Sequence, residues 1–377
     1  IHNIKVMLFH KAPTDMQYSN YKEEKDKTIY FKEFKNSFEI ISSPIKNKNK
    51  NKKINKIKEE FYHLIKIIKY IKFEKPDLIY IDNANIWSAG IVSRLYNIPV
   101  VFRLLGIYPY ISKLSHNKLK ISQRILKWLF KAPFDLVINT NDGSGKNSDV
   151  IQLLKPGTTY QLLLNGVNIP KKEIKYNLPK LNINNNSLVC LFISKLETYK
   201  GCITFVETII SGIKEGINLH AIIIGEGSQK RKIIELINNA KLEKKFSVIG
   251  SIAHKDIFYY HRISDIYVSL NHLGNISNTN LEAIKYGQVV IFPRELFNET
   301  DNEDIKLLGE NNILWIKNPN DKYGLLKHLH KINKNKELLE IYKKNIVPLS
   351  NLLPTWEKRI KKEISLLESQ LNLNSDR

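Results

Sequence analysis

Short apolar runs alternate with segments of helical period along most of this sequence, and the alternation limits the possible folds more than any other feature. In the first half, buried strands are predicted at Leu78–Ile81, Pro99–Phe102 and Asp135–Ile138. In the second half they are predicted at Leu188–Ser194, His220–Ile224, Phe246–Gly250, Ile266–Leu270 and Val289–Pro293. Strands that alternate with helices predict parallel sheets with helices on both faces, so the fold class is α/β.

The alternation breaks once, at Leu162–Pro170. Asn165-Gly166 predicts a turn there, Ile169-Pro170 predicts an extended link, and a polar run follows. A chain of 377 residues is expected to form two domains. We therefore predict an N-terminal domain over residues 1–167, a second domain over 168–350 and a C-terminal helix over 351–377.

The chain is strongly basic, with a net charge of +22 from 59 basic and 37 acidic residues. A field of that sign attracts nucleic acid, anionic lipid or phosphorylated molecules. The densest basic run, Lys46–Lys56, is predicted to be a solvated loop in preference to a lipid-binding patch. Nucleic acid is not expected as a partner, because no nucleic-acid motif is present and aromatic residues do not interleave with the basic ones.

Several features bear on location and metal binding. No apolar run approaches the roughly 20 residues that span a bilayer, and Ile4–Phe9 is too short for the core of a signal peptide. The two cysteines, Cys190 and Cys202, offer neither a disulfide framework nor a metal site, which fits a reducing compartment. We therefore expect a cytoplasmic protein. Because neither a zinc-ligand spacing nor a DxD motif occurs, we also expect that it needs no metal and no cofactor.

The stretch Ser269–Gly287 is the strongest candidate for a binding site. It predicts a strand end, a polar loop and a helix over Asn280–Tyr286, with Gly287 as its C-terminal cap. Loops at the carboxyl ends of parallel strands bind ligands, and a helix N-terminus suits phosphate. Glu282 has two readings: a capping box with Thr279, or an acceptor for sugar hydroxyls.

Two further loops also carry groups suited to phosphate. Lys195 and Lys200 follow one predicted strand and flank one loop, where both cations can turn toward a diphosphate. Gly225-Glu226-Gly227 follows the next strand and precedes a helix, so its backbone can approach a phosphate or ribose closely. Taken alone, the first motif is more simply explained by two solvated lysines, and the second is equally explained by a tight turn.

These motifs together resemble the carboxyl-terminal half of glycosyltransferase family 4 enzymes of the GT-B type. The matching segments occur in the family's order: Ile193–Leu196 with Lys200-Gly201, Gly225–Gly227, Phe246–Gly250, Ser264–Ile266, and Leu281–Ala283 with Gly287 and Val289-Val290. Elsewhere Pro76–Ile79, Asn165–Val167 and Trp356-Glu357 are similar to the family's Pro-Asp segment, hinge and last helix.

The resemblance implies a GT-B fold of two Rossmann-like domains that face a cleft, with the C-terminal helix crossing back onto the first. It implies sugar transfer from a nucleotide-sugar, with retention of configuration and usually without metal. Lys195 and Lys200 would hold the donor diphosphate, and Glu282 would bind ribose. The other donor-binding positions it implies are Gly225, Glu226, Gly227, Ile276, Ser277, Asn278 and Thr279.

The sequence departs from the family in three places. Gly274 stands where the family has the first Glu of its E-x7-E pair, so Asn275 is predicted to replace that contact. Leu105 precedes Gly106 where a His is common, and Arg103 is the nearby substitute on the acceptor side. The family's first strand and Gly-Gly loop are not recognisable, so we expect a truncated N-terminus or an altered acceptor domain.

The expected function is transfer of a sugar to a glycan or lipid-linked acceptor, in bacterial surface polysaccharide synthesis by family analogy. The basic charge adds an anionic membrane surface as an expected partner, with the protein peripheral on its inner face. Two alternatives remain open. One is a nucleotide-sugar-binding GT-B protein that has lost transfer, and the other is a GT-B epimerase, although no additional acid/base residues point to the epimerase.

Overall fold

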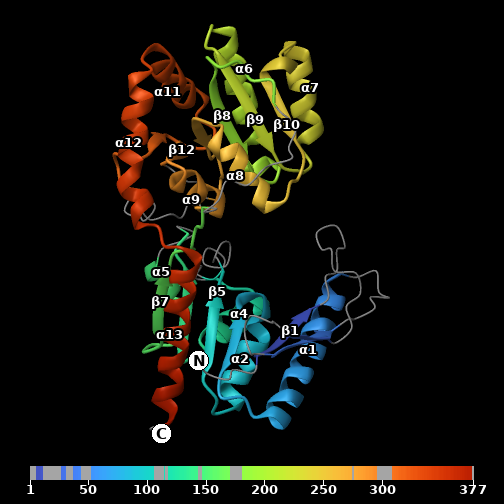
Figure 1. Cartoon of the computed structure of the whole chain (residues 1–377). Coiled ribbons are helices and arrows are strands. Elements are labelled where there is room, and N and C mark those ends of the chain that lie inside the picture. The colour runs from blue at the N-terminus through green and yellow to red at the C-terminus, as the bar shows by residue number, and fades with distance from the viewer. Residues whose placement is uncertain are drawn as a thin grey trace.

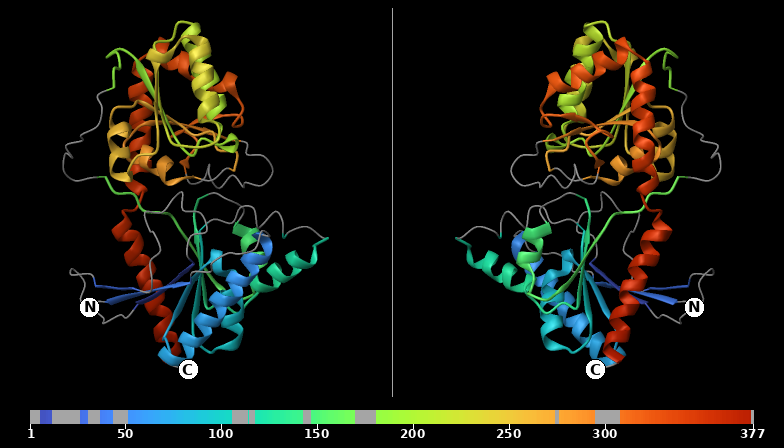
Figure 2. Two further views of the ribbon diagram at one scale, coloured as in Figure 1. Left: turned by 90° about the vertical axis from the view of Figure 1, so that its right-hand side faces the viewer. Right: turned by 90° about the vertical axis from the view of Figure 1, so that its left-hand side faces the viewer.

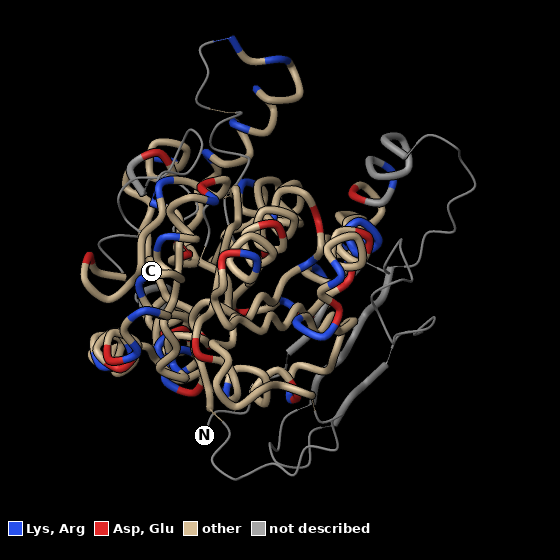
Figure 3. The backbone as a smooth tube through the Cα atoms, turned by 90° about the horizontal axis from the view of Figure 1, so that it is seen from above, with Lys and Arg blue, Asp and Glu red and all other residues tan. Residues whose placement is uncertain are grey.

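The chain folds into two α/β domains joined near residue 167, with a long C-terminal helix lying along the first (Figure 1). The computed structural model describes residues 6–11, 27–30, 37–43, 52–105, 114, 118–142, 147–169, 181–273, 276–294 and 308–375. Figure 2 shows the same two domains from the sides. Lys and Arg are spread over the helices, with Asp and Glu between them (Figure 3).

The first domain is built on a parallel sheet whose four described strands are in chain order: β4 (Ile79–Asp82), β5 (Val100–Leu104), β6 (Leu136–Thr140) and β7 (Thr159–Leu163). Before it, β1 (Val6–Lys11) pairs in parallel with β3 (Ser37–Ser43), and β2 (Lys27–Tyr30) pairs antiparallel with β3. One face of the larger sheet is covered by α1 (Lys52–Glu74), α2 (Ile86–Leu95), α4 (Ile121–Phe130) and α5 (Asn147–Leu153).

The second domain has a six-stranded parallel sheet in its described residues. The strand order is β10 (Phe246–Ile249), β9 (Leu219–Ile224), β8 (Leu188–Ile193), β11 (Ile266–Val268), β12 (Val289–Pro293) and β13 (Leu314–Ile316). The helices are α6 (Cys202–Lys214), α7 (Lys230–Ala240), α8 (His254–Arg262), α9 (Asn278–Lys285), α11 (Lys322–Lys334) and α12 (Glu337–Leu352). The order reverses at β8 and β11, where ligands bind in open sheets of this kind.

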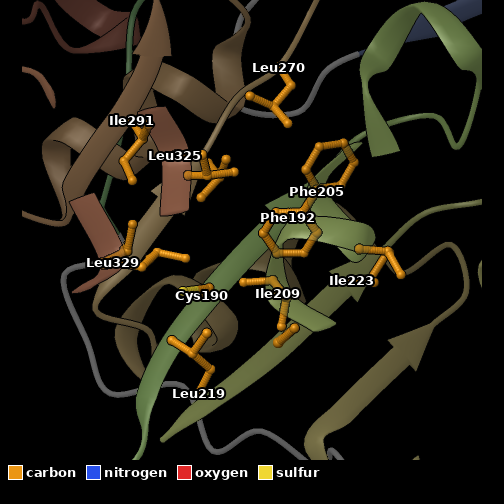
Figure 4. Packing of buried hydrophobic residues seen from close by; sticks show 14 of the residues in the cluster. Cys190, Phe192, Phe205, Ile209, Leu219, Ile223, Leu270, Ile291, Leu325 and Leu329 are labelled. Carbon is orange, nitrogen blue, oxygen red and sulfur yellow. The ribbon is translucent and has the colours of Figure 1, made fainter. Parts of the chain in front are cut away.

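Strand β8 shows why a continuous apolar run forms a central strand. Successive side chains point to opposite faces: Cys190 and Phe192 join the core under α6, α7 and α11, whereas Leu191 joins the core under α8, α9 and α12. Phe192 stacks on Phe205 of α6 with ring centroids 5.1 Å apart (Figure 4). Because both faces are buried, each large side chain contributes roughly 1.5–3 kcal/mol.

Helix α13 (Trp356–Ser375) crosses back and covers the other face of the first sheet. Leu366 and Leu367 pack against the cluster of Val101, Leu136, Ile138 and Leu163. At the crossing, the Val167 N–H donates to the Pro354 carbonyl at 2.8 Å. A Cβ on Gly166 would lie 2.4 Å from the Cα of Trp356, so only glycine allows the two segments to pass this closely.

Most predicted strands are confirmed within one or two residues. The sequence also predicts strands at Ile4–Phe9, Phe38–Ser42 and Asn312–Ile316, which correspond to β1, β3 and β13. Strands β2 and β7 were not predicted, and β7 begins inside a segment that the sequence left unassigned. The solvated-loop prediction for Lys46–Lys56 is wrong from Lys52 onward, where α1 begins; residues 46–51 lie outside the described part. Among the helices that the structure describes, none is long and apolar enough to cross a bilayer.

Candidate functional site

Three loops meet at the carboxyl edge of the second sheet, on the side that faces the first domain (Figure 1). They follow β8, β9 and β11. The Leu196 N–H donates to the Glu226 carbonyl at 2.9 Å, and the His272 N–H donates to the Tyr199 carbonyl at 2.9 Å. The structure therefore brings together the three loops that were separate candidates in the sequence: the loop with Lys195 and Lys200, the loop with Gly225–Gly227, and the loop within Ser269–Gly287.

The loop after β8 places Lys195 and Lys200 near one another. It ends in a short 3-10 turn, and Gly201 adopts φ = +73° as the N-cap of α6. A Cβ on Gly201 would lie 2.4 Å from the Cβ of Leu270, in the loop after β11. Glycine at this position thus serves both the left-handed turn and the contact between loops.

Lys200 is the cation best suited to meet an anion here. Its side chain is half-buried, and its Nζ lies 5.1 Å from the centre of the Tyr199 ring. Burial, and then the charge of Lys195, lower the pKa of Lys200 below the 10.5 of an ordinary lysine. Lys200 forms no ion pair with any residue that the structure describes. A bound anion would relieve this arrangement of two nearby cations.

The glycines of Gly225-Glu226-Gly227 are required by packing between loops. A Cβ on Gly225 would overlap the Ser194 carbonyl oxygen, and one on Gly227 would lie 2.5 Å from the Leu196 carbonyl oxygen. Glu226 forms an exposed ion pair with Lys230 of 2.6 Å. This geometry supports the tight-turn reading, and donor binding by these three residues stays a prediction.

The helix after β11 begins earlier than predicted and is capped differently. Ser277 is the N-cap of α9, and its Oγ accepts from the Asn280 N–H at 3.4 Å. Thr279 is instead hydrogen-bonded to Tyr267, whose hydroxyl donates to its Oγ1 at 2.9 Å. The predicted capping box of Thr279 with Glu282 is therefore not formed, because Ser277 and not Thr279 is the N-cap. The free N-terminus of α9 still presents the Ser277, Asn278 and Thr279 N–H groups, which donate to no described residue.

Two hydrogen bonds join this helix start to the first domain. The Ile276 N–H donates to the Asp142 carbonyl at 2.6 Å, so in this arrangement it is not available to a donor phosphate or sugar, as the sequence predicted it would be. Asn165 Nδ2 donates to Asn278 Oδ1 at 2.9 Å. The N-terminus of α9 thus lies at the boundary between the domains. Gly274 and Asn275, the next predicted contacts, lie outside the described residues.

Glu282 projects from α9 into a buried network of two histidines. Glu282 is only 4% exposed, and its Oε1 accepts a hydrogen bond from His254 Nε2 at 2.7 Å. Its Oε2 lies 3.6 Å from His261 Nε2, and neither of these two atoms has a hydrogen-bond partner among the described residues. Oε2 is therefore enclosed beside His261, whereas Oε1 lies toward the exposed side chain of His254, where a hydroxyl donor can compete for it.

His261 is fixed by a chain of hydrogen bonds behind Glu282. Its Nδ1 lies 2.6 Å from Gln288 Oε1, while Gln288 Nε2 donates to the Ser264 carbonyl. The ring also stacks on Tyr286 at 5.7 Å. Sequence reasoning missed both histidines. For His261 the available signal was its position on the helix predicted over Ile257–Ile263, although histidine on a helix face is more often structural. His254 lies before that predicted helix, so it carried no such signal.

Arg103, predicted for the acceptor side, is buried beneath α13. Its guanidinium donates to the Leu104 and Ile138 carbonyls at 2.6 and 3.0 Å and to Thr140 Oγ1 at 2.9 Å. Its Nε lies 3.7 Å from Glu363 of α13. Because these contacts use its donors, the placement gives Arg103 a structural role in holding α13. Gly106 lies outside the described residues.

No group of three or more His, Cys, Asp or Glu side chains in the described part of the chain could hold a metal ion. The groups gathered at the site are Lys195 and Lys200, the N-terminus of α9, and the Glu282 carboxylate with its two histidines. These groups fit a phosphorylated ligand that also carries hydroxyls.

Comparisons with solved structures define the fold class. Sucrose-phosphate synthase from Thermosynechococcus elongatus superimposes with a TM-score of 0.71 at 15% identity, covering 98% of this chain and 89% of that one. Anabaena Alr3699/HepE in complex with UDP gives a TM-score of 0.65 at 15% identity, covering 88% and 86%. These likenesses, with the two parallel sheets, confirm the predicted GT-B fold.

The family comparison identifies the second domain. Residues 173–347 match the family described as Glycosyl transferases group 1, so the chain contains a glycosyltransferase domain. The alpha-monoglucosyldiacylglycerol synthase of Acholeplasma laidlawii is 24% identical over 271 residues, or 67% of this chain. The alignment spans 65% of that relative's length, slightly less than two thirds.

Proposed function

We propose that the protein transfers a sugar from a nucleotide-sugar donor bound mainly by the second domain. One observation carries the proposal: Lys200 is half-buried beside Lys195 and forms no ion pair with any described residue. A diphosphate would neutralise the two cations. The stabilisation would grow as the nucleoside diphosphate leaves with its additional charge, which is the condition for acceleration.

The remaining groups have complementary roles in the proposal. The N–H groups of Ser277, Asn278 and Thr279 at the start of α9 would bind phosphate or sugar oxygens. Glu282 would accept hydrogen bonds from ribose hydroxyls through Oε1, in competition with the exposed side chain of His254. Retention of configuration, without metal or cofactor, is part of the proposal and rests on the family resemblance. UDP is the first donor nucleotide to test, since Alr3699/HepE was solved with it.

The acceptor is proposed to be a glycan or a lipid-linked molecule that enters from the first domain. The resemblance to an alpha-monoglucosyldiacylglycerol synthase supports a lipid-linked acceptor. The net charge of +22 supports work at an anionic membrane surface, with the protein cytoplasmic and peripheral. A place in bacterial surface polysaccharide synthesis completes the proposal.

The test is thermal stability of the full chain with UDP, GDP, ADP and their sugars. We expect one nucleotide series to raise the melting temperature, because a ligand that binds only the folded state stabilises it. Glu282→Ala and Lys200→Ala should each reduce the shift. Glu215→Ala is the matched control, because Glu215 also accepts from a histidine, His330, at 2.6 Å but on the surface of the second domain, outside the site loops.

If none of the donors raises the melting temperature, or if the increase survives in both site variants, the donor site is overturned. A donor that binds is then tested for transfer and hydrolysis. Binding without turnover of any acceptor panel would favour the nucleotide-sugar-binding protein without transfer. Interconversion of the donor sugar without transfer would favour the epimerase.

A further inference from the structure

Helix α1 has an outward face that combines apolar and basic side chains. The exposed residues recur at spacings of three and four, so they share one side of the helix. They are Lys58, Phe61, Tyr62, Ile65, Lys69, Lys72 and Phe73, and we call them the outward α1 face. Phe61 is 64% exposed and Phe73 is 75% exposed, while Tyr62 and Ile65 are nearly half exposed.

The opposite side of α1 already supplies the contacts that hold the helix in place. Leu64, Ile67 and Ile71 are buried in the core of the first domain. Glu60 and His63 are also buried on that side. The outward α1 face is therefore not needed for folding, and four large apolar side chains on it meet solvent. Such a contiguous exposed set on a folded domain marks an interaction surface.

Charge narrows the kind of partner. Lys66 Nζ lies 5.4 Å from the Tyr62 ring centre, and Lys69 Nζ lies 6.0 Å from that of Phe73. Of the acidic residues of α1 whose side chains the structure describes, Glu60 is buried and Glu74 ends the helix. The fold corrects the expectation that aromatic residues do not interleave with basic ones, because one turn of α1 brings each of these lysines beside an aromatic ring. Such a face suits a surface that is anionic outside and apolar beneath.

We propose that the outward α1 face docks the protein on an anionic lipid bilayer. The rings would enter the headgroup region while the lysine ammonium groups meet lipid phosphates. A second copy of the chain fits less well, because a two-fold contact through this face would oppose lysines to lysines. Nucleic acid fits less well too, since Ile65 cannot stack on a base and the face carries no arginine.

Helix α1, which carries the docking surface, belongs to the first domain and lies on the opposite side of its sheet from α13 (Figure 1). Docking itself does not depend on transfer. Its value for reaching a lipid-linked acceptor rests on the proposed function. A domain held on the bilayer would meet such an acceptor within the plane of the membrane, where the effective concentration is high.

The experiment is flotation of the full chain with vesicles of phosphatidylcholine, with or without phosphatidylglycerol, in the absence of donor and acceptor. We expect binding to the anionic vesicles and a loss of binding as salt rises. The variant Phe61→Ser/Phe73→Ser should weaken binding roughly tenfold or more. Lys69→Gln/Lys72→Gln should weaken it by a similar factor, since each surface lysine contributes roughly fivefold.

The matched control is Tyr323→Ser, because Tyr323 is 78% exposed on α11 of the second domain. It should leave vesicle binding unchanged. All substitutions are at exposed positions, and circular dichroism and melting temperature confirm that the variants fold.

Three results would overturn the proposal. The first is equal vesicle binding by the wild type and by both α1 variants. The second is a dimer in size-exclusion chromatography that Phe61→Ser/Phe73→Ser abolishes, with no vesicle binding. The third is displacement from vesicles by a single-stranded oligonucleotide at comparable affinity. The nucleotide-dependent melting shift should be the same in the α1 variants, so failure of docking and failure of the donor site are distinguishable.

Discussion

His254 Nε2 donates to Glu282 Oε1 at 2.7 Å, and this hydrogen bond covers the carboxylate that is proposed to bind ribose. His254 itself begins α8 and its side chain is 66% exposed, whereas Glu282 is buried. A ligand can therefore displace the exposed His254 side chain into solvent, whereas the Glu282 carboxylate is held in place by the residues that bury it. Ligand hydroxyls must compete with His254 for Oε1.

The first prediction follows from that competition. His254→Ala should strengthen binding of the donor nucleotide by about two- to fivefold, near the net free energy of one hydrogen bond. Glu282→Ala should weaken it. Isothermal titration calorimetry with the nucleotide measures both, and His330→Ala is the control for loss of a surface His–Glu pair. Weakened binding in His254→Ala would mean instead that the histidine orients Glu282.

The second prediction concerns pH and Lys200. Its pKa is lowered, by burial first and by Lys195 second, and a bound diphosphate would raise it again. Binding therefore takes up a proton once the pH exceeds the pKa of the free protein. Affinity should be constant below that pKa and should fall as the pH rises through it, toward the pKa of the complex.

The pH dependence of nucleotide affinity in the Lys195→Ala variant checks this prediction. Removing the neighbouring charge raises the pKa of Lys200, so the fall in affinity should move to higher pH. In Lys200→Met the pH dependence in this range should largely disappear. An unchanged profile in both variants would show that neither lysine contacts the diphosphate. Lys214→Met, at the far end of α6, serves as the matched control.

The strands of the second domain could be predicted from sequence because their apolar runs are continuous. Strand β8 is buried at every position, and polar residues bound it, with Asn186 and Ser187 before it and Ser194 and Lys195 after it. Strand β7 lacks that signal, since Thr159 is exposed and the next three residues are only partly buried. Its position at the end of the sheet explains the difference.

The placement of a predicted site residue agrees with the structure where its neighbours lie in its own loop, and it differs where a distant partner contacts the residue. Lys200 lies in the loop after β8, as the sequence predicts, and its role in binding stays a prediction. Arg103 was assigned to the acceptor because nothing local shows that Glu363, 260 positions later in the chain, lies 3.7 Å from its guanidinium. The Ile276 N–H was misassigned for the same reason, because Asp142 belongs to the other domain.

The third prediction tests the contact between two site loops. Gly201→Ala should destabilise the protein by about 3 kcal/mol or more, since the new Cβ meets Leu270 as well as a left-handed backbone. Gly216→Ala is the matched control, because Gly216 has φ = +88° with nothing within 4 Å of the added Cβ. It should cost only about 1 kcal/mol. Urea unfolding measures the difference, and equal losses would show that the loop contact contributes nothing.

The fourth prediction concerns the anchor of α13 on the first domain. Glu363 lies between the buried guanidinium groups of Arg103 and Arg359 and accepts from the Tyr80 hydroxyl, whose pKa is raised by burial and then by Glu363. Glu363→Gln removes the compensating charge and should destabilise the protein by about 2–4 kcal/mol, because it leaves two buried cations unpaired. Glu357→Gln, which breaks an exposed pair with Lys361 on the same helix, should cost less than about 0.5 kcal/mol. Proteolysis at the start of α13 should accelerate in the first variant alone, and equal stability of the two variants would contradict an electrostatic anchor.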